Sequence, residues 1–138
     1  MIYVFGYSSR SRDEKIVKET PSKLAKVRKH QEGLLQDALK KYKEPGDFWD
    51  KVYGQISSDL QKMETVEGLA KEVVKYAGMG SLEETERCLN EIDVASNSVE
   101  SFHPFSEFYQ QQIAKVPSFD TYKVAAINFT KEKQLASK

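Results

Sequence analysis

Apolar side chains recur every three or four residues along most of this chain, and this spacing constrains its fold more than any other feature. The clearest series lies between residues 47 and 77 and consists of Trp49, Val52, Tyr53, Ile56, Leu60, Met63, Val66, Leu69, Ala70, Val73 and Ala77. Because an α-helix turns once every few residues, these positions share one face of a helix. The series predicts a single helix of about 30 residues, about 45 Å long.

A first helix is predicted over residues 21–43. Thr20 and Pro21 are typical of an N-cap and of the first helical position. The apolar stripe that follows them consists of Leu24, Val27, Leu34, Leu35, Ala38, Leu39 and Tyr42. Pro45 and Gly46 end this helix, because proline disfavours helix in the residue before it and glycine gives the turn conformational freedom.

A third helix is predicted over residues 82–116. It follows the turn sequence Gly-Met-Gly at 78–80, and Ser81 with Glu84 has the spacing of a capping box. Its apolar stripe is Leu82, Cys88, Leu89, Ile92, Ala95, Val99 and Phe102, resumed by Phe105, Phe108, Tyr109, Ile113 and Val116. Pro104 is expected to interrupt or kink this helix, because proline removes a backbone hydrogen bond.

The short turns between these segments force neighbouring helices to pack side by side. The sequence therefore predicts an all-α fold, an antiparallel bundle of three long helices plus a short C-terminal helix. For residues 122–129 the spacing favours helix over strand. Residues 1–19 are expected to form an extended or loop N-terminal segment, because β-branched and aromatic side chains crowd the start, and residues 20–138 to form one helical domain.

The net charge is zero, but the charges are unevenly distributed. Residues 1–43 carry 11 Lys and Arg against 5 Asp and Glu, residues 44–107 carry 5 against 14, and residues 108–138 carry 5 against 2. The basic first helix can lie along the acidic later helices, or it can present a basic face to an anionic partner. The sequence leaves both alternatives open.

Few residues are available for catalysis or for metal binding. His30 and His103 are the only histidines and Cys88 is the only cysteine, and no pair has the spacing of a metal site. Cys88 lies on the apolar stripe, so we expect a buried and inert thiol. We therefore expect no catalytic residues, no metal and no cofactor. The single cysteine and the absence of a long apolar run favour a cytoplasmic, reducing compartment without a transmembrane segment.

The leading hypothesis is a non-enzymatic protein–protein interaction module, a subunit or adaptor in a larger assembly, bound to a protein partner or to a second copy. An alternative is a helical domain that binds a membrane surface or nucleic acid through the basic run at 23–30. An enzyme with a site between helices is the third alternative. The candidate partner-binding residues are Ile2, Tyr3, Phe5, Tyr7, Lys23, Lys26, Arg28 and Lys29.

Overall fold

The computed structural model describes the backbone of residues 2–41 and 46–136, and the side chains of residues 12–41, 46 and 49–136. Its elements are the α-helices α1 (Ile2–Lys41), α2 (Asp47–Gly78), α3 (Leu82–Ser98) and α4 (Phe119–Ala136), with a single π-helical turn, η1 (Tyr109–Ile113). Within these ranges the chain forms no strand. The all-α prediction is thus confirmed, and so is the prediction of helix rather than strand for residues 122–129.

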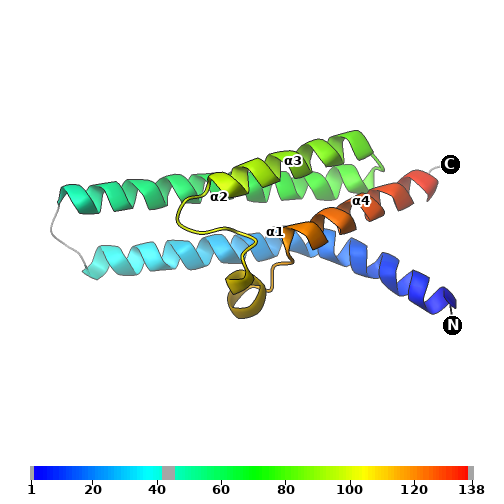
Figure 1. Cartoon of the computed structure of the whole chain (residues 1–138), viewed down its shortest axis with the longest axis horizontal. Coiled ribbons are helices and arrows are strands. Elements are labelled where there is room, and N and C mark those ends of the chain that lie inside the picture. Colours follow the sequence, from blue (N-terminus) through cyan, green and yellow to red (C-terminus); the bar gives the residue numbers. More distant parts are fainter. Residues whose placement is uncertain (1, 42–45, 137–138) are drawn as a thin grey trace.

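The helices form an elongated bundle in which α2 and α4 lie between α1 and α3 (Figure 1). Helix α2 packs against both α1 and α3, and α4 packs against all three of the others. In the described part of the chain, α1 and α3 do not contact each other. Both ends of the drawn helical chain lie at the same end of the bundle, away from the connection between α1 and α2 (Figure 1). Helices α1 and α3 therefore occupy opposite sides of the molecule.

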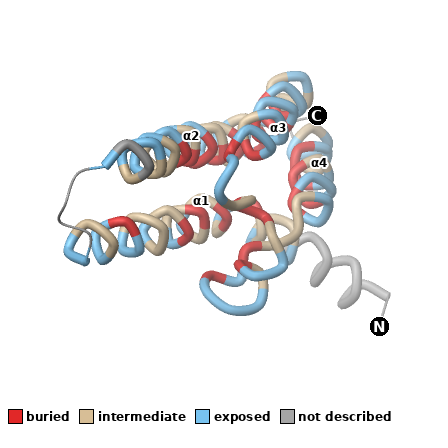
Figure 2. The backbone as a smooth tube through the Cα atoms, turned by 60° about the vertical axis from the view of Figure 1, so that its left-hand side comes forward, coloured by how far each residue is buried: buried red, intermediate tan, exposed pale blue. Residues whose placement is uncertain are grey.

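The core lies where all four helices meet, and the tube coloured by burial shows it along their inward faces (Figure 2). Helix α1 contributes Val17, Leu24 and Val27, α2 contributes Met63, Val66, Ala70, Val73 and Ala77, α3 contributes Cys88, Leu89 and Ile92, and α4 contributes Tyr122, Ala125, Ala126 and Phe129. The apolar stripes read from the sequence are the surfaces that pack here. The stripe of α2 divides, however, because Val52, Ile56 and Leu60 are only partly buried.

The N-terminus differs from the prediction. Residues 2–19, expected to be extended or loop, are helical, and α1 continues through Thr20 and Pro21 instead of starting there. The Thr20 hydroxyl donates a hydrogen bond of 2.6 Å to the carbonyl of Ile16, while Pro21 has no N–H to donate to Val17. Helix α1 bends toward its N-terminal end (Figure 1). Val17 and Thr20, which lie just before the predicted start, are buried, so packing favours a helix that continues through Pro21.

The third helix is shorter than predicted. Helix α3 ends at Ser98 rather than continuing to residue 116, and an irregular segment with the η1 turn connects it to α4 (Figure 1). The buried carboxylate of Asp59 on α2 accepts the backbone N–H groups of Glu100 at 3.0 Å and Ser101 at 2.9 Å. These two N–H groups therefore bond to a side chain of another helix instead of continuing α3. Pro104 then prevents an early return to α-helix.

The turn between α2 and α3 forms where the sequence predicts it. Gly80 has φ 72°, and the amides of Gly80 and Ser81 donate to the carbonyls of Ala77 and Tyr76, both at 3.0 Å, as in a Schellman motif. The predicted capping box does not form, because the Ser81 side chain makes no capping hydrogen bond. Glu84 pairs with Arg87 at 2.9 Å instead.

Candidate interaction groove

Helices α1 and α2 extend beyond the other helices as a two-helix arm (Figure 1). The arm consists of residues 31–41 of α1 and 49–60 of α2. It arises because α2 has 32 residues whereas α3 has 17, so α3 covers only part of its neighbour. The burial pattern changes at the same place: buried residues are frequent in the body and sparse in the arm (Figure 2). The arm therefore presents apolar positions that no other helix covers within the described residues.

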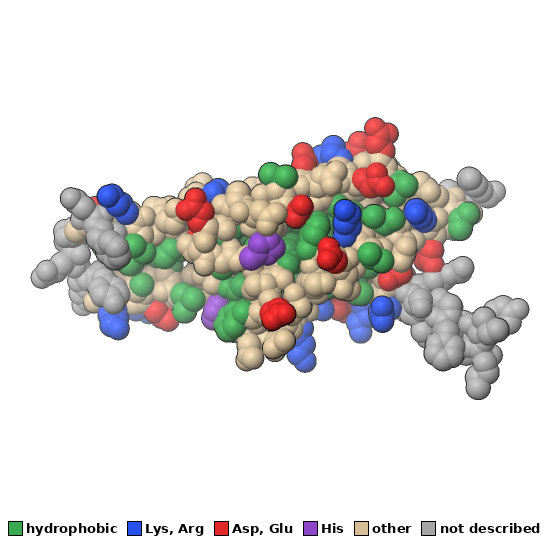
Figure 3. Space-filling view, viewed as in Figure 1, with side chains coloured by type: hydrophobic (Ala, Val, Ile, Leu, Met, Phe, Trp, Pro, Cys, Tyr) green, Lys and Arg blue, Asp and Glu red, His purple; other side chains and the backbone are tan. Residues whose placement is uncertain are grey.

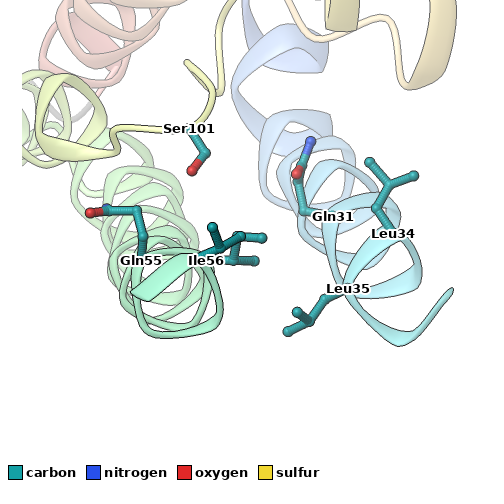
Figure 4. A pocket seen from close by; sticks show the side chains of 7 residues that line it. Gln31, Leu34, Leu35, Gln55, Ile56 and Ser101 are labelled. Carbon is teal, nitrogen blue, oxygen red and sulfur yellow. The ribbon is translucent and has the colours of Figure 1, made fainter. Parts of the chain in front are cut away.

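A groove of about 320 Å³ lies between the two helices of the arm. Its lining is mainly apolar and consists of Leu34, Leu35, Val52 and Ile56, with Gln31, Gln55 and Ser101 adding polar atoms. Leu35 and Ile56 point toward each other across the gap between the helices (Figure 4). Leu34 is 51% exposed, a large fraction for a leucine next to an apolar groove. An apolar lining with a few polar groups is typical of a binding site.

Asp59 fixes the inner end of this groove. Besides the two backbone amides at 100 and 101, its carboxylate accepts a hydrogen bond of 3.1 Å from the Gln55 side chain. Burial acts to raise the pKa of Asp59, but hydrogen bonds from Ser101, Glu100 and Gln55 outweigh burial, so the pKa lies below its ordinary value. The carboxylate is therefore ionised at neutral pH, and it holds Ser101 and Gln55 in the groove wall.

Aromatic side chains border the groove on the α1 side. Phe108 is 52% exposed, and its ring lies 6.3 Å from that of His30 and 5.3 Å from that of Tyr109. The Gln31 side-chain amide, which lines the groove, donates a hydrogen bond to the hydroxyl of the buried Tyr109. Burial raises the pKa of Tyr109, and this hydrogen bond acts in the opposite direction. Leu34 lies one helical turn from His30 on α1, and the His30 ring lies next to that of Phe108.

The candidate residues from the sequence lie elsewhere. Ile2, Tyr3, Phe5 and Tyr7 belong to the first turns of α1, and their side chains fall outside the described set. The structure does not bring the four basic candidates together into one site, because their side chains face different neighbours. Lys26 and Lys29 are exposed, Lys23 pairs with Glu19 at 3.4 Å, and Arg28 pairs with Glu32 and Glu67.

The pairing of Arg28 is close and partly buried. Its guanidinium lies 2.6 Å from the carboxylates of both Glu67, on α2, and Glu32, one turn along α1. Hydrogen bonds to Glu67 and to Glu32 raise the pKa of Arg28. The sequence left open whether the basic first helix pairs with the acidic later helices or faces a partner. Arg28 pairs internally, with Glu67 of α2.

The groove residues were not among the candidates from the sequence. Their signal was present but incomplete: the apolar stripes of the first and second helices continue to the connection between them. The predicted third helix over 82–116 was long enough to cover both stripes. Because α3 ends at Ser98, no further helix covers the stripes of the arm in the described part of the chain, and the groove remains open between α1 and α2.

The residues that could carry chemistry offer little in the structure. Cys88 is buried as predicted, and burial, opposed by the nearby Arg87, raises the pKa of its thiol. Such a thiol is a poor nucleophile. Among the described residues, no group of three His, Cys, Asp or Glu side chains could hold a metal ion. No helix in that same part of the chain is long and apolar enough to span a bilayer.

In comparisons with known proteins, no family model, no curated protein and no solved structure matches this chain. The function must therefore be inferred from the geometry.

Proposed function

We propose that this chain is a protein-interaction module, an adaptor or subunit of a larger assembly, whose arm groove binds one amphipathic helix of a partner protein. The groove itself is the observation that carries this proposal. In the body of the bundle, α4 lies against both α1 and α2. In the arm the same two helices continue, apolar residues still line the space between them, and no element of the described chain fills it.

The lining suggests the chemistry of the bound helix. A helix that continues the packing of α4 along this seam would place apolar residues at i, i+3 or i+4, and i+7 against Leu35, Val52 and Ile56. Leu34, which is half exposed, would supply further apolar contact at the edge. Gln31, Gln55 and Ser101 would meet polar side chains on the flanks of that helix.

The test begins with a photo-crosslinking amino acid at position 34 of the full chain, expressed in its source cells. Position 124 on α4 is the matched control, because Val124 is 57% exposed and lies away from the arm. The proposal expects a discrete crosslinked protein from position 34 but not from position 124. The crosslinked segment should be amphipathic with helical spacing.

A synthetic peptide of that segment then decides the outcome. It should gain helicity on binding to the wild-type chain. Leu34→Asp should weaken its binding by about tenfold or more, the effect of a removed apolar anchor, while Val124→Asp should not. Equal effects of the two substitutions, a peptide that stays non-helical, or a crosslink only to a second copy of this chain would each contradict the proposal.

A further inference from the structure

The outward face of α1 is a row of cations. Its exposed basic residues are Arg12, Lys15, Lys18, Lys26, Lys29 and Lys40, named here the basic face. At α-helical spacing these positions fall within about one third of the helix circumference and extend over about 40 Å. Carboxylates also reach solvent on the described part of α1: Asp37 is exposed, and the side chains of Glu14, Glu19 and Glu32 are 39%, 43% and 42% exposed and pair with Lys18, Lys23 and Arg28. The basic run read from the sequence at 23–30 contributes only Lys26 and Lys29.

The outward face of α3 has the opposite charge. Its exposed acidic residues are Glu83, Glu86, Glu91 and Asp93, named here the acidic face, and acidic side chains gather over this helix in the space-filling view (Figure 3). Arg87 is the only cation of α3, and it pairs with Glu84 and Glu91. Within the described part of the chain, no ion pair involves Glu83, Glu86 or Asp93.

These two faces point away from each other. Helices α1 and α3 make no contact within the described residues, and α2 and α4 lie between them. The basic and acidic faces therefore cannot neutralise each other within one molecule. The molecule is a neutral rod with a basic side and an opposite acidic side.

Three kinds of anionic partner differ in what they need from the basic face. Insertion into a membrane surface needs apolar residues beside the cations, but Val17, Leu24 and Val27 are buried in the core. Nucleic acid favours proteins with a strong net positive charge, whereas this chain has none. A partner helix needs only carboxylates at helical spacing to match the basic face. Its carboxylates and the cations of α1 then repeat along the two helices with the same pitch of about 5.4 Å.

We infer that the basic face of α1 binds the acidic face of α3 on a second copy of the same chain. Because the faces lie on opposite sides, a bound pair of copies still presents one unoccupied basic face and one unoccupied acidic face. Such head-to-tail contacts repeat, so they lead to rings or open filaments rather than to a closed two-fold dimer. This surface is separate from the arm groove.

The mass of the full chain in solution tests the inference, measured by light scattering over a range of protein concentrations. At about 0.01 M salt, where charges act over about 30 Å, the average mass should rise well above the 15.8 kDa of one chain. At about 1 M salt, where that range shrinks to about 3 Å, the protein should be monomeric. A monomer at every salt and protein concentration would overturn the inference.

Charge reversal identifies the surfaces. Lys26→Glu with Lys29→Glu lowers the charge of the six basic-face residues from +6 to +2, and Glu86→Lys with Asp93→Lys brings the charge of the four acidic-face residues from −4 to zero. Each double variant alone should stay monomeric at low salt, whereas an equimolar mixture should associate again. Lys123→Glu with Lys131→Glu on α4, also exposed, is the matched control and should associate like the wild type.

Three outcomes would contradict the assignment of these faces: association of either double variant alone, no recovery in the mixture, or loss of association in the α4 control. Thermal melts confirm that every variant is folded. Leu34→Asp should leave self-association intact. Failure of this inference is therefore distinguishable from failure of the groove proposal.

Discussion

The buried carboxylate of Asp59 connects α2 to the segment that follows α3. It accepts hydrogen bonds from Gln55 and from the backbone of residues 100 and 101, and it is fully buried. An isolated buried charge would be costly, but three donors compensate this one. The periodicity of the sequence could not reveal this role, because Asp59 lies among polar residues of α2 and its partners are about 40 positions away.

Asp59→Asn should destabilise the fold by about 2–3 kcal/mol. The new side-chain amide would direct an NH₂ group at a backbone N–H, which leaves buried donors without an acceptor. Urea denaturation measures the change. Glu64→Gln, at an exposed carboxylate of the same helix, is the control and should alter stability by less than about 0.5 kcal/mol. Equal effects of the two substitutions would mean that the Asp59 hydrogen bonds contribute little.

His103 makes stability depend on pH. Its Nδ1 accepts the Phe105 N–H at 3.1 Å, so the ring is neutral, and Nε2 donates to Asn97 at 3.1 Å. Burial lowers the pKa of His103, and Asp93 acts weakly in the opposite direction. As the pH falls, His103 in the unfolded chain, with a pKa of about 6.5, therefore binds a proton at a higher pH than His103 in the folded chain.

The free energy of unfolding should accordingly fall as the pH drops below about 6.5, toward the lower pKa of folded His103. Denaturation at a series of pH values measures this slope, and His103→Gln should flatten it. The lowered pKa of Asp59 predicts a second loss below about pH 4, which Asp59→Asn should remove. Stability that stays constant between pH 7.5 and 5 would contradict the His103 prediction.

At the scale of elements, apolar spacing and turn residues predicted the existence of the helices better than the residues at which they begin and end. Apolar spacing located all three long helices, and the Gly-Met-Gly turn lies where it was expected. The limits depended on contacts between distant residues. Packing of Val17 carries α1 through Pro21, and Asp59 holds the segment that follows α3. The sequence around the start of α1 and around the end of α3 gives no local signal of either contact.

Gly80 and Gly78 provide a matched test of the turn. Gly80 has φ 72°, and an added Cβ would lie 3.0 Å from the backbone nitrogen of Gln134 on α4. Gly80→Ala should therefore destabilise the protein by more than about 1–2 kcal/mol, the cost of the left-handed conformation alone. Gly78→Ala has open space and should be neutral or stabilise by up to about 1 kcal/mol. Chemical denaturation measures both, and a harmless Gly80→Ala would disprove the close approach of α4.

The whole molecule divides into a four-helix body and a two-helix arm, and this division is what the sequence least predicted. The stripe of α2 is uniform along its length, so periodicity cannot tell residues that a neighbour covers from those that none covers. The groove depends on the residue at which α3 ends. The opposed charged faces depend on α1 and α3 being the two helices that do not contact each other. Both are properties of the assembled bundle.

Truncations along α2 should expose this division. Met63→Ala, in the body, should cost about 2–5 kcal/mol, as expected for a fully buried side chain. Ile56→Ala, in the arm, should cost less than about 1.5 kcal/mol, because Ile56 is only partly buried. Thermal or urea unfolding measures both. Similar costs would mean that the arm is packed as tightly as the body, which would weaken the case for an open groove.

Both ends of the drawn helical chain lie at the end of the bundle opposite the arm (Figure 1). A tether attached at either end would therefore leave the arm projecting outward, with its groove directed away from the point of attachment. A long rod held at one end sweeps its far end through a larger volume than a compact domain of equal mass. Immobilised by a terminus on a sensor surface, this chain should thus display the groove in an accessible orientation, whichever terminus is used.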